Sequence, residues 1–374
     1  MELDDDLVDD DLVKVRDTAR EHAAALRDRA LAVDLAPQDL RPHLECPGVR
    51  FVGELLERPL QVLRMTVALF ELARGDAGMI LAAPGPALAG VAVGLIGDQA
   101  QAQRLAEAVR DGQTWAFMAV TEPQAGSDAT RLSARLRPDG YGGYLLSGHK
   151  CYIGNGARGR IGVVFARTGN GPRSVCAALV EAPAAGLSAT ALDSIGLRGA
   201  GISEMDFRDV PVPASGLLGQ HRPAAERGIF GALRVFNIVR VYVAALAAGT
   251  AAAVHETVLA ETGPHPVLDA AQARIAAARQ LTLRAAASVE ADFRNGYLPS
   301  MAKLAAVRIA QDACDRLPAL LGRGALLDYP LLEKWRRDAM GFEFMEGTSH
   351  IQQLNVARHR IGSQAPQRRG DQDV

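Results

Sequence analysis

The distribution of apolar positions divides the chain into a helical part, a β-rich part and a second helical part. Apolar residues recur at helical spacing in the first hundred residues, and long Ala-, Leu- and Val-rich segments return after residue 228. Between them, short β-branched and aromatic runs alternate with Gly, Pro and Asp, as in strands joined by tight turns. The pattern predicts N-terminal helices, a small antiparallel β-domain and a C-terminal bundle of helices.

The periodicity also predicts individual elements. In the first part we expect a loop over 36–50 and helices over 1–35, 54–73, 76–96 and 98–110. In the middle part we expect strands that include 144–146, 161–166, 175–180 and 204–207. In the last part we expect helices over 229–261, 267–296 and 298–321, and a fourth that begins before His350. The predicted domains are 1–114, 115–218 and 219–362, and we expect the polar tail, 363–374, to be disordered.

Composition narrows the class of protein. The 374 residues are 48% hydrophobic and carry a net charge of −2, so nothing indicates nucleic-acid binding. The N-terminus is acidic and no uninterrupted apolar run reaches about 18 residues, so we expect neither a signal peptide nor a membrane span. The four cysteines lack metal-ligand spacing. We therefore expect no metal, and a cytoplasmic protein with reduced thiols.

Glu346 is the candidate catalytic residue. It lies between Met345 and Gly347 in the stretch 337–352, after an apolar-rich segment. A carboxylate set against a buried cavity has a raised pKa, which suits it to act as a general base near neutral pH. From this stretch alone, a solvated Glu that caps a helix-terminal turn is the alternative.

A second motif favours a catalytic Glu346 over a solvated helix cap. Residues 120–128 read VTEPQAGSD, a strand end that enters a hydroxyl-rich turn in which Gly126 permits close backbone approach. With MEGTS at 345–349, it makes the chain resemble the acyl-CoA dehydrogenase family, most strongly over 72–362. The resemblance implies an α+β fold with an N-terminal helical domain, a small β-barrel domain and a C-terminal four-helix bundle. It also implies FAD as cofactor and a homodimer or homotetramer.

The resemblance assigns roles to individual residues. Glu346 would remove the α-proton of an acyl thioester while the β-hydride goes to the flavin, and its own backbone N–H would bind the thioester oxygen. The implied FAD contacts are Val120, Thr121, Ser127, Tyr152, Gly154, Gln272, Gly322, Thr348 and His350. The implied substrate contacts are Ser127, Asn237, Arg240 and Gly347. Asn237 and Arg240 are three residues apart and would share one helix face.

Several positions depart from the family pattern. Tyr152 replaces the usual tryptophan and Gly154 the usual hydroxyl residue, in a segment whose Asn155-Gly156 also predicts a hairpin turn. Glu261 stands where the family has an arginine for the FAD of a neighbouring subunit, so an anion would face a diphosphate. Pro318 and Leu321 replace a glutamine and a glycine of a turn near that cofactor.

The leading functional prediction is an FAD-dependent dehydrogenase of acyl-CoA or acyl-carrier-protein thioesters, with specialised biosynthesis as its favoured setting. The departures leave a second class open: a protein of the same fold that has lost FAD and either does redox-neutral thioester chemistry or pairs with an active paralogue. A flavin monooxygenase of related fold is a third possibility, and the presence of Glu346 weighs against it.

Overall fold

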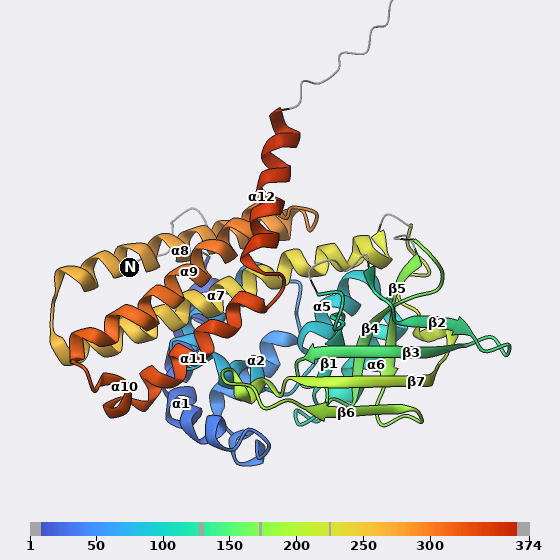
Figure 1. The fold of residues 1–374 in the computed structure, drawn as a ribbon, viewed down its shortest axis with the longest axis horizontal. Coiled ribbons are helices and arrows are strands. Elements are labelled where there is room, and N and C mark those ends of the chain that lie inside the picture. Colours follow the sequence, from blue (N-terminus) through green and yellow to red (C-terminus); the bar gives the residue numbers. More distant parts are fainter. Residues whose placement is uncertain (1–8, 127–130, 172–173, 224–225, 365–374) are drawn as a thin grey trace, which may run out of the picture.

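The molecule consists of two helical parts with a curled β-sheet at one end (Figure 1). The computed structural model describes residues 9–126, 131–171, 174–223 and 226–364. Residues 1–8 and 365–374, which include parts of the predicted first helix and of the predicted tail, lie outside the described residues. The predicted fold class is confirmed, whereas the predicted domain boundaries stay predictions.

Prolines divide the N-terminal part more finely than the periodicity predicts. Its helices are α1 (Asp10–Leu35), α2 (Pro47–Leu56), α3 (Val62–Ala73), α4 (Ala77–Ala82), α5 (Ala87–Ile96) and α6 (Gln99–Val109). The helices predicted over 54–73 and 76–96 are each two helices, because Pro59, Pro84 and Pro86 lie where a continuous helix would need a backbone N–H. The loop predicted over 36–50 ends early, since Pro47 is the first residue of α2, a position where its missing N–H costs nothing.

Helix α6 confirms the helix predicted over 98–110, and a capping box defines its start. The Asp98 carboxylate accepts a hydrogen bond from the backbone N–H of Gln101 at 2.9 Å. The Gln101 side chain accepts one from the backbone N–H of Asp98 at 3.0 Å. This reciprocal capping box fixes the start of the helix locally.

The sheet is mixed rather than wholly antiparallel. Its strands are β1 (Ala116–Ala119), β2 (Arg135–Pro138), β3 (Tyr144–Ile153), β4 (Ile161–Arg167), β5 (Val175–Glu181), β6 (Leu187–Ala191) and β7 (Ser203–Val212). Their order is β1-β4-β2-β3-β7-β6, with β5 on β4. Strand β1 is parallel to β4, and β2 also touches β4 in parallel. The antiparallel prediction was wrong there because β2 and β3 intervene in the chain, which gives the crossover that parallel strands need. The Asn155-Gly156 turn joins β3 to β4 without forming a hairpin, because β2 lies between these two strands in the sheet.

The C-terminal part contains α7 (Gly228–Thr262), α8 (Pro266–Ala291), α9 (Tyr297–Arg316), α10 (Ala325–Asp328), α11 (Pro330–Phe344) and α12 (Ser349–Gln364). The helix predicted over 298–321 ends at Arg316 and continues as a 3₁₀ turn, Leu317–Leu321. The predicted fourth helix is α11. After it, α12 projects from the body of the molecule (Figure 1).

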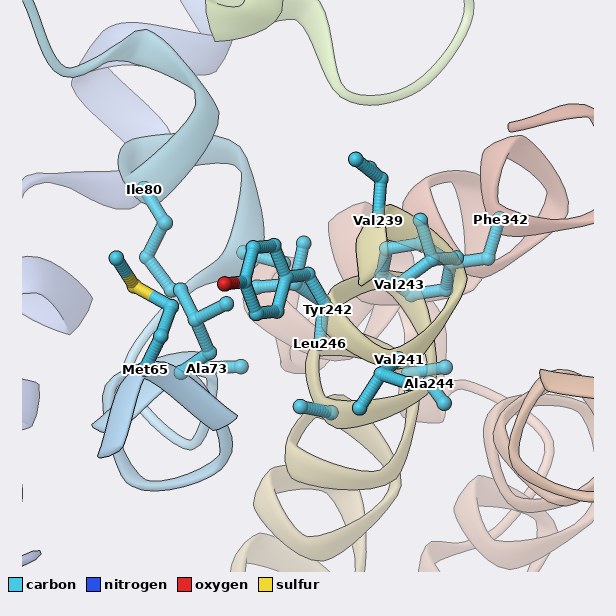
Figure 2. Close-up of a cluster of buried hydrophobic side chains, with 14 of the residues drawn as sticks. Met65, Ala73, Ile80, Val239, Val241, Tyr242, Val243, Ala244, Leu246 and Phe342 are labelled. Atoms are coloured by element: carbon cyan, nitrogen blue, oxygen red, sulfur yellow. The ribbon is translucent and has the colours of Figure 1, made fainter. Parts of the chain in front are cut away.

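Helix α7 is the central core element. Figure 2 shows its Tyr242 directed toward Met65, Ala73 and Ile80 of the N-terminal helices, while Phe342 of α11 lies on another side of α7. The Tyr242 hydroxyl donates to the Pro59 carbonyl at 2.9 Å, so its polar end is satisfied inside the core. Among the described residues, α7 is the one helix long and apolar enough to cross a membrane, but 78% of its apolar window is buried in the protein. It is therefore read as a core helix.

Candidate active site

Glu346 lies in the turn between α11 and α12, at the end of α11 nearer the sheet (Figure 1). Its φ is 54°, and that of Gly347 is 95°. The left-handed conformation is open to glycine but costs other residues about 1–2 kcal/mol. A non-glycine residue keeps such a conformation only where surrounding contacts impose it.

Two side chains fix the turn through its carbonyl groups. Arg240 of α7 donates from Nε to the Glu346 carbonyl at 3.2 Å. Gln352 of α12 donates from Nε2 to the carbonyls of Glu346 and Gly347, at 3.1 and 2.9 Å. Arg240 and Gln352 are both buried. They therefore hold the backbone of Glu346 rather than its carboxylate.

A lysine completes the set of donors. Lys303 of α9 donates from Nζ to the carbonyls of Glu343, at 3.1 Å, and Gly347. The Glu343 carboxylate accepts from the backbone N–H and the hydroxyl of Ser349, at 2.7 and 2.6 Å, and so caps the start of α12. Helices α7, α9, α11 and α12 thus meet at this one turn.

The Glu346 carboxylate itself has no hydrogen-bond or ion-pair partner among the residues that the structure describes, and neither has its backbone N–H. Burial raises the pKa of this carboxyl above its usual value, while the charges of Arg240 and Lys303 oppose the rise. Burial also lowers the pKa of Arg240 to about 10, against the attraction of Glu346, and that of Lys303 to about 8. At neutral pH both cations are mostly charged, and the carboxylate is a free base of raised pKa.

The VTEP segment is tied to β3 by a buried ion pair. Lys150 is fully buried and donates from Nζ to the Val120 carbonyl and to Glu122 Oε1, both at 2.8 Å. Ser133 and Ala134 donate three further hydrogen bonds to the Glu122 carboxylate, at 2.6 to 2.9 Å. Burial disfavours the Glu122 charge, yet Lys150 and these donors hold the pKa of Glu122 below its usual value. The pair therefore fixes Val120 and Thr121 beside β3.

Tyr152 and Gly154 leave an open face next to this segment. Tyr152 has φ 59° at an irregularity of β3, and the residue is 69% exposed. A Cβ added to Gly154 would meet nothing closer than the Ala200 carbonyl at 3.9 Å, and one added to Gly126 only Thr121 at 3.8 Å. Exposed aromatic surface beside open backbone suits stacking against a flat ring. The residues on this side therefore fit the isoalloxazine half of FAD.

The loop at 196–199 connects the two sides of the site. Leu197, left-handed at φ 50°, donates from its backbone N–H to Asp338 Oδ1 of α11 at 2.6 Å. A side chain on Gly341 of α11 would collide with Leu197. Three residues further on, the Ala200 carbonyl accepts from the backbone N–H of Asn155 at 2.9 Å. The loop thus connects the Tyr152 end of β3 to α11, the helix that precedes Glu346.

The predicted substrate contact Asn237 is buried, and its amide is used within the protein. Its Oδ1 accepts from Arg240 Nη1 at 2.9 Å, and its Nδ2 donates to the Phe293 carbonyl at 3.0 Å. Thr348, just before α12, is half-buried, and His350, in the first turn of α12, is exposed. Ser127 lies outside the described residues.

The remaining predicted FAD contacts lie at the other end of the bundle. Gln272 is exposed near the start of α8, and Gly322 is exposed with nothing within 4 Å of an added Cβ. Glu261 is exposed at the end of α7, where its carboxylate accepts from the Tyr329 hydroxyl at 2.9 Å. Along α7, Glu261 is about 30 Å from Arg240. One chain therefore does not bring these residues to the Glu346 turn.

Two cavities of the described chain lie elsewhere. One, of about 460 Å³, lies between the end of α1 and residues 191–201, and the other, of about 220 Å³, is lined by α1, Glu71, Arg74 and Glu256. Neither includes a predicted site residue. The face around Tyr152 and Gly154 is open, since Tyr152 is exposed and a Cβ added to Gly154 would meet nothing closer than 3.9 Å.

Several site residues were missed by the sequence predictions. They are Glu122, Lys150, Lys303, Glu343 and Gln352. The scarcity of lysine in the sequence was a signal for three buried lysines. Among 41 basic residues only four are lysine, and Lys150, Lys303 and Lys334 of these are buried. A chain that uses arginine almost everywhere else keeps lysine where a compact buried ammonium is needed.

The middle domain of the acyl-CoA dehydrogenases matches residues 117–210, and their C-terminal domain matches residues 265–361. The cyclohexane-1-carbonyl-CoA dehydrogenase of Geobacter metallireducens is 34% identical over 256 residues, which are 64% of this chain and 66% of that enzyme. The short-chain specific acyl-CoA dehydrogenase of Sus scrofa is 30% identical over 337 residues, 83% of this chain and 78% of that enzyme.

Solved structures share the fold. A glutaryl-CoA dehydrogenase of Mycobacterium smegmatis in complex with FADH2 superposes with a TM-score of 0.81 at 21% identity, covering 96% of each chain. The prolyl acyl carrier protein oxidase AnaB superposes with a TM-score of 0.79 at 22% identity, covering 94% of this chain and 99% of its own. With its two domain matches and its identity to curated relatives, the chain belongs to the acyl-CoA dehydrogenase family of flavoprotein oxidoreductases, as its two motifs predicted.

Proposed function

We propose that the protein is an FAD-dependent acyl-thioester dehydrogenase in which Glu346 removes the α-proton of the substrate. One observation carries the proposal: the Glu346 carboxylate and the backbone N–H of the same residue are both unpartnered within the described chain. A base needs a free lone pair, and a thioester oxygen that gains charge needs a free donor. Both are present at one residue, which the turn holds in a fixed conformation.

Different residues of the chain would position the base, hold the proton and bind the flavin. Arg240, Lys303 and Gln352 hold the carbonyls of the turn, so the carboxylate and the N–H stay in a set relation during proton removal. Burial gives the carboxylate a raised pKa, so it can hold the abstracted proton. Val120, Thr121, Tyr152 and Gly154 would hold the flavin ring. FAD, the cofactor that the family relationship supports, supplies when bound an acceptor for the β-hydride.

We also propose a homodimer or homotetramer. The predicted FAD contacts of one chain form two sets, with Gln272 and Gly322 at the end of the bundle away from the Glu346 turn. A second copy could place its Gln272 set beside the first copy's Tyr152 set and complete one cofactor site. Static light scattering should then give a molar mass of at least twice the 39.6 kDa of one chain. A monomer that retains a full complement of flavin would refute the composite site.

The acyl carrier stays open between CoA and a carrier protein. The curated relatives named above are CoA enzymes, and the structural neighbour AnaB is a carrier-protein oxidase. The departures from the family pattern at Gly154 and Glu261 favour a role in specialised biosynthesis over core fatty-acid oxidation.

The test has two steps. First, the visible spectrum of the purified protein is recorded with and without added FAD, and about one flavin per chain is expected. Second, exchange of the α-protons of a bound thioester with D2O is followed by mass spectrometry for the wild type and for Glu346→Gln. Exchange in the wild type and its loss in the variant are expected, and equal exchange in both would remove Glu346 from the mechanism.

A second candidate function is redox-neutral thioester chemistry without FAD. Glu261 favours it, because an exposed carboxylate stands where a diphosphate partner would need a cation. The unpartnered base at Glu346 could still enolise a thioester. Persistent α-proton exchange in a protein that takes up no flavin from excess FAD would select this function over the first.

A further inference from the structure

Lys303 is a buried cation without an ion pair. Its side chain is 1% exposed, and no carboxylate of the described residues lies within 4 Å of its ammonium group. The other two buried lysines differ, because Lys150 pairs with Glu122 and Lys334 pairs with Asp76 and Asp338. A buried charge that only carbonyls solvate is costly to keep.

Capping alone does not account for this charge. The Gly347 carbonyl that Lys303 binds already accepts from the neutral amide of Gln352 at 2.9 Å. The Glu343 carbonyl, at 3.1 Å from Nζ, lies at the end of α11 and could be served by a neutral donor or by water. A neutral side chain would satisfy both carbonyls at a lower desolvation cost.

We propose that Lys303 is a positioning residue for Glu346, holding the turn of the base through two carbonyls and supplying a positive charge that keeps its carboxylate ionised and ready to accept a proton. The inference rests on the proposed function and adds a residue to it. Lys303 touches no reacting atom in this scheme and acts only through Glu346.

The charged groups around Glu346 indicate that Lys303 and Arg240 have different roles. The charged groups facing the base are Arg240 from α7 and Lys303 from α9, and Glu343 on α11 is engaged by Ser349. Helix α12 contributes the neutral Gln352, with His350 exposed. Arg240 binds Asn237 as well as the Glu346 carbonyl, whereas the two hydrogen bonds of Lys303 go to the carbonyls of Glu343 and Gly347 on either side of Glu346.

The test separates charge from hydrogen bonding. Lys303→Gln keeps a donor but removes the charge, Lys303→Arg keeps the charge, and Lys14→Gln removes the one exposed lysine as a matched control. For each, the rate of α-proton exchange of a bound thioester is measured across pH. The pKa of Glu346 is measured independently by carboxyl ¹³C NMR, assigned by its loss in Glu346→Gln. Thermal unfolding is recorded in parallel.

In Lys303→Gln we expect the midpoint of the exchange profile and the NMR pKa to rise together by about one unit, the effect of losing one nearby opposite charge. In Lys303→Arg and Lys14→Gln both should stay within about 0.3 units of the wild type, well below the effect of a lost charge. A lower unfolding temperature in Lys303→Gln with neither midpoint moved would show a structural cap and overturn the inference. Absence of exchange in the wild type would instead refute the proposed function, and the NMR titration would still decide the role of Lys303.

Discussion

The substitution Lys334→Met tests how α11, the helix that precedes Glu346, is anchored. Lys334 of α11 donates from Nζ to Asp76 Oδ2 at 2.5 Å and to Asp338 Oδ2 at 2.6 Å, and all three side chains are buried. Asp76 also accepts from Trp335 Nε1 at 3.0 Å, and Asp338 from the backbone of Leu197. The cluster thus joins α4, α11 and the loop of the β-rich part.

The geometry sets the size of the effect. Because both oxygens bind one ammonium nitrogen, they lie no more than about 5 Å apart, and two unit charges at that distance repel by about 3 kcal/mol at an effective dielectric constant of 20. Methionine removes the cation that offsets this repulsion. Breaking a buried ion pair from one side costs about 3–5 kcal/mol. At roughly 2 °C per kcal/mol for a chain of this size, the unfolding temperature should fall by about 6–10 °C.

The pH dependence has a definite sign. Burial raises the pKa of Asp338 even with Lys334 present, and loss of the cation should raise it further in the folded variant. The folded variant then binds more protons than the unfolded chain, so its stability falls as pH rises through the interval from about 4 to the raised pKa. The deficit of Lys334→Met relative to the wild type should therefore be smaller at pH 5 than at pH 8.

Differential scanning calorimetry at both pH values measures this, with Lys14→Met as the matched surface control. The double variant Asp76→Asn with Lys334→Met removes one charge of the repelling pair and should recover part of the loss. An equal deficit at pH 5 and pH 8, or no recovery in the double variant, would refute the account of two repelling buried carboxylates.

Four further predictions concern the site itself. Glu346→Gln should raise the unfolding temperature at pH 8 and not at pH 4, because burial raises the pKa of this carboxyl and its ionised form costs stability above that pKa; calorimetry measures this. For the same reason, wild-type exchange should decline as pH falls through the raised pKa. Lys150→Met should lower the free energy of unfolding in denaturant by about 3–5 kcal/mol and release flavin, since it leaves the buried Glu122 charge unpaired. Full flavin retention would contradict the view that the Lys150–Glu122 pair holds the VTEP segment in place beside β3. Tyr152→Ala should change stability by less than about 0.5 kcal/mol, because the ring is exposed, yet weaken FAD binding in a fluorescence titration, and unchanged affinity would place the ring outside the flavin site.

The elements were predicted best where their signals are local. The helices over 98–110 and 229–261 were predicted from apolar periodicity, which involves neighbours in the chain, and the structure has them as α6 and α7. The parallel pairing of β1 with β4 joins segments about 45 residues apart and has no local signature. The division into α2 and α3 was readable from Pro59 but was outweighed by the apolar pattern on both sides.

The site residues also divide into those that the sequence identified and those that only the structure brought together. The sequence alone identified Glu346 as the candidate base and the VTEP segment as its companion, because the type and order of residues carry that chemistry. It did not show that Lys303, Arg240 and Gln352 converge on the carbonyls around Glu346, or that Lys150 and Glu122 form a buried pair. Those contacts join residues up to 106 positions apart.

The sequence by itself therefore determined the family, the helical and β-rich parts, and the residue types available for chemistry. The tertiary structure alone decided which charges are buried, what faces them, and how the Glu346 turn is held in a left-handed conformation. The reason is physical. Propensity and periodicity act between neighbours in the chain, whereas desolvation and Coulomb interactions depend on distances that only packing fixes.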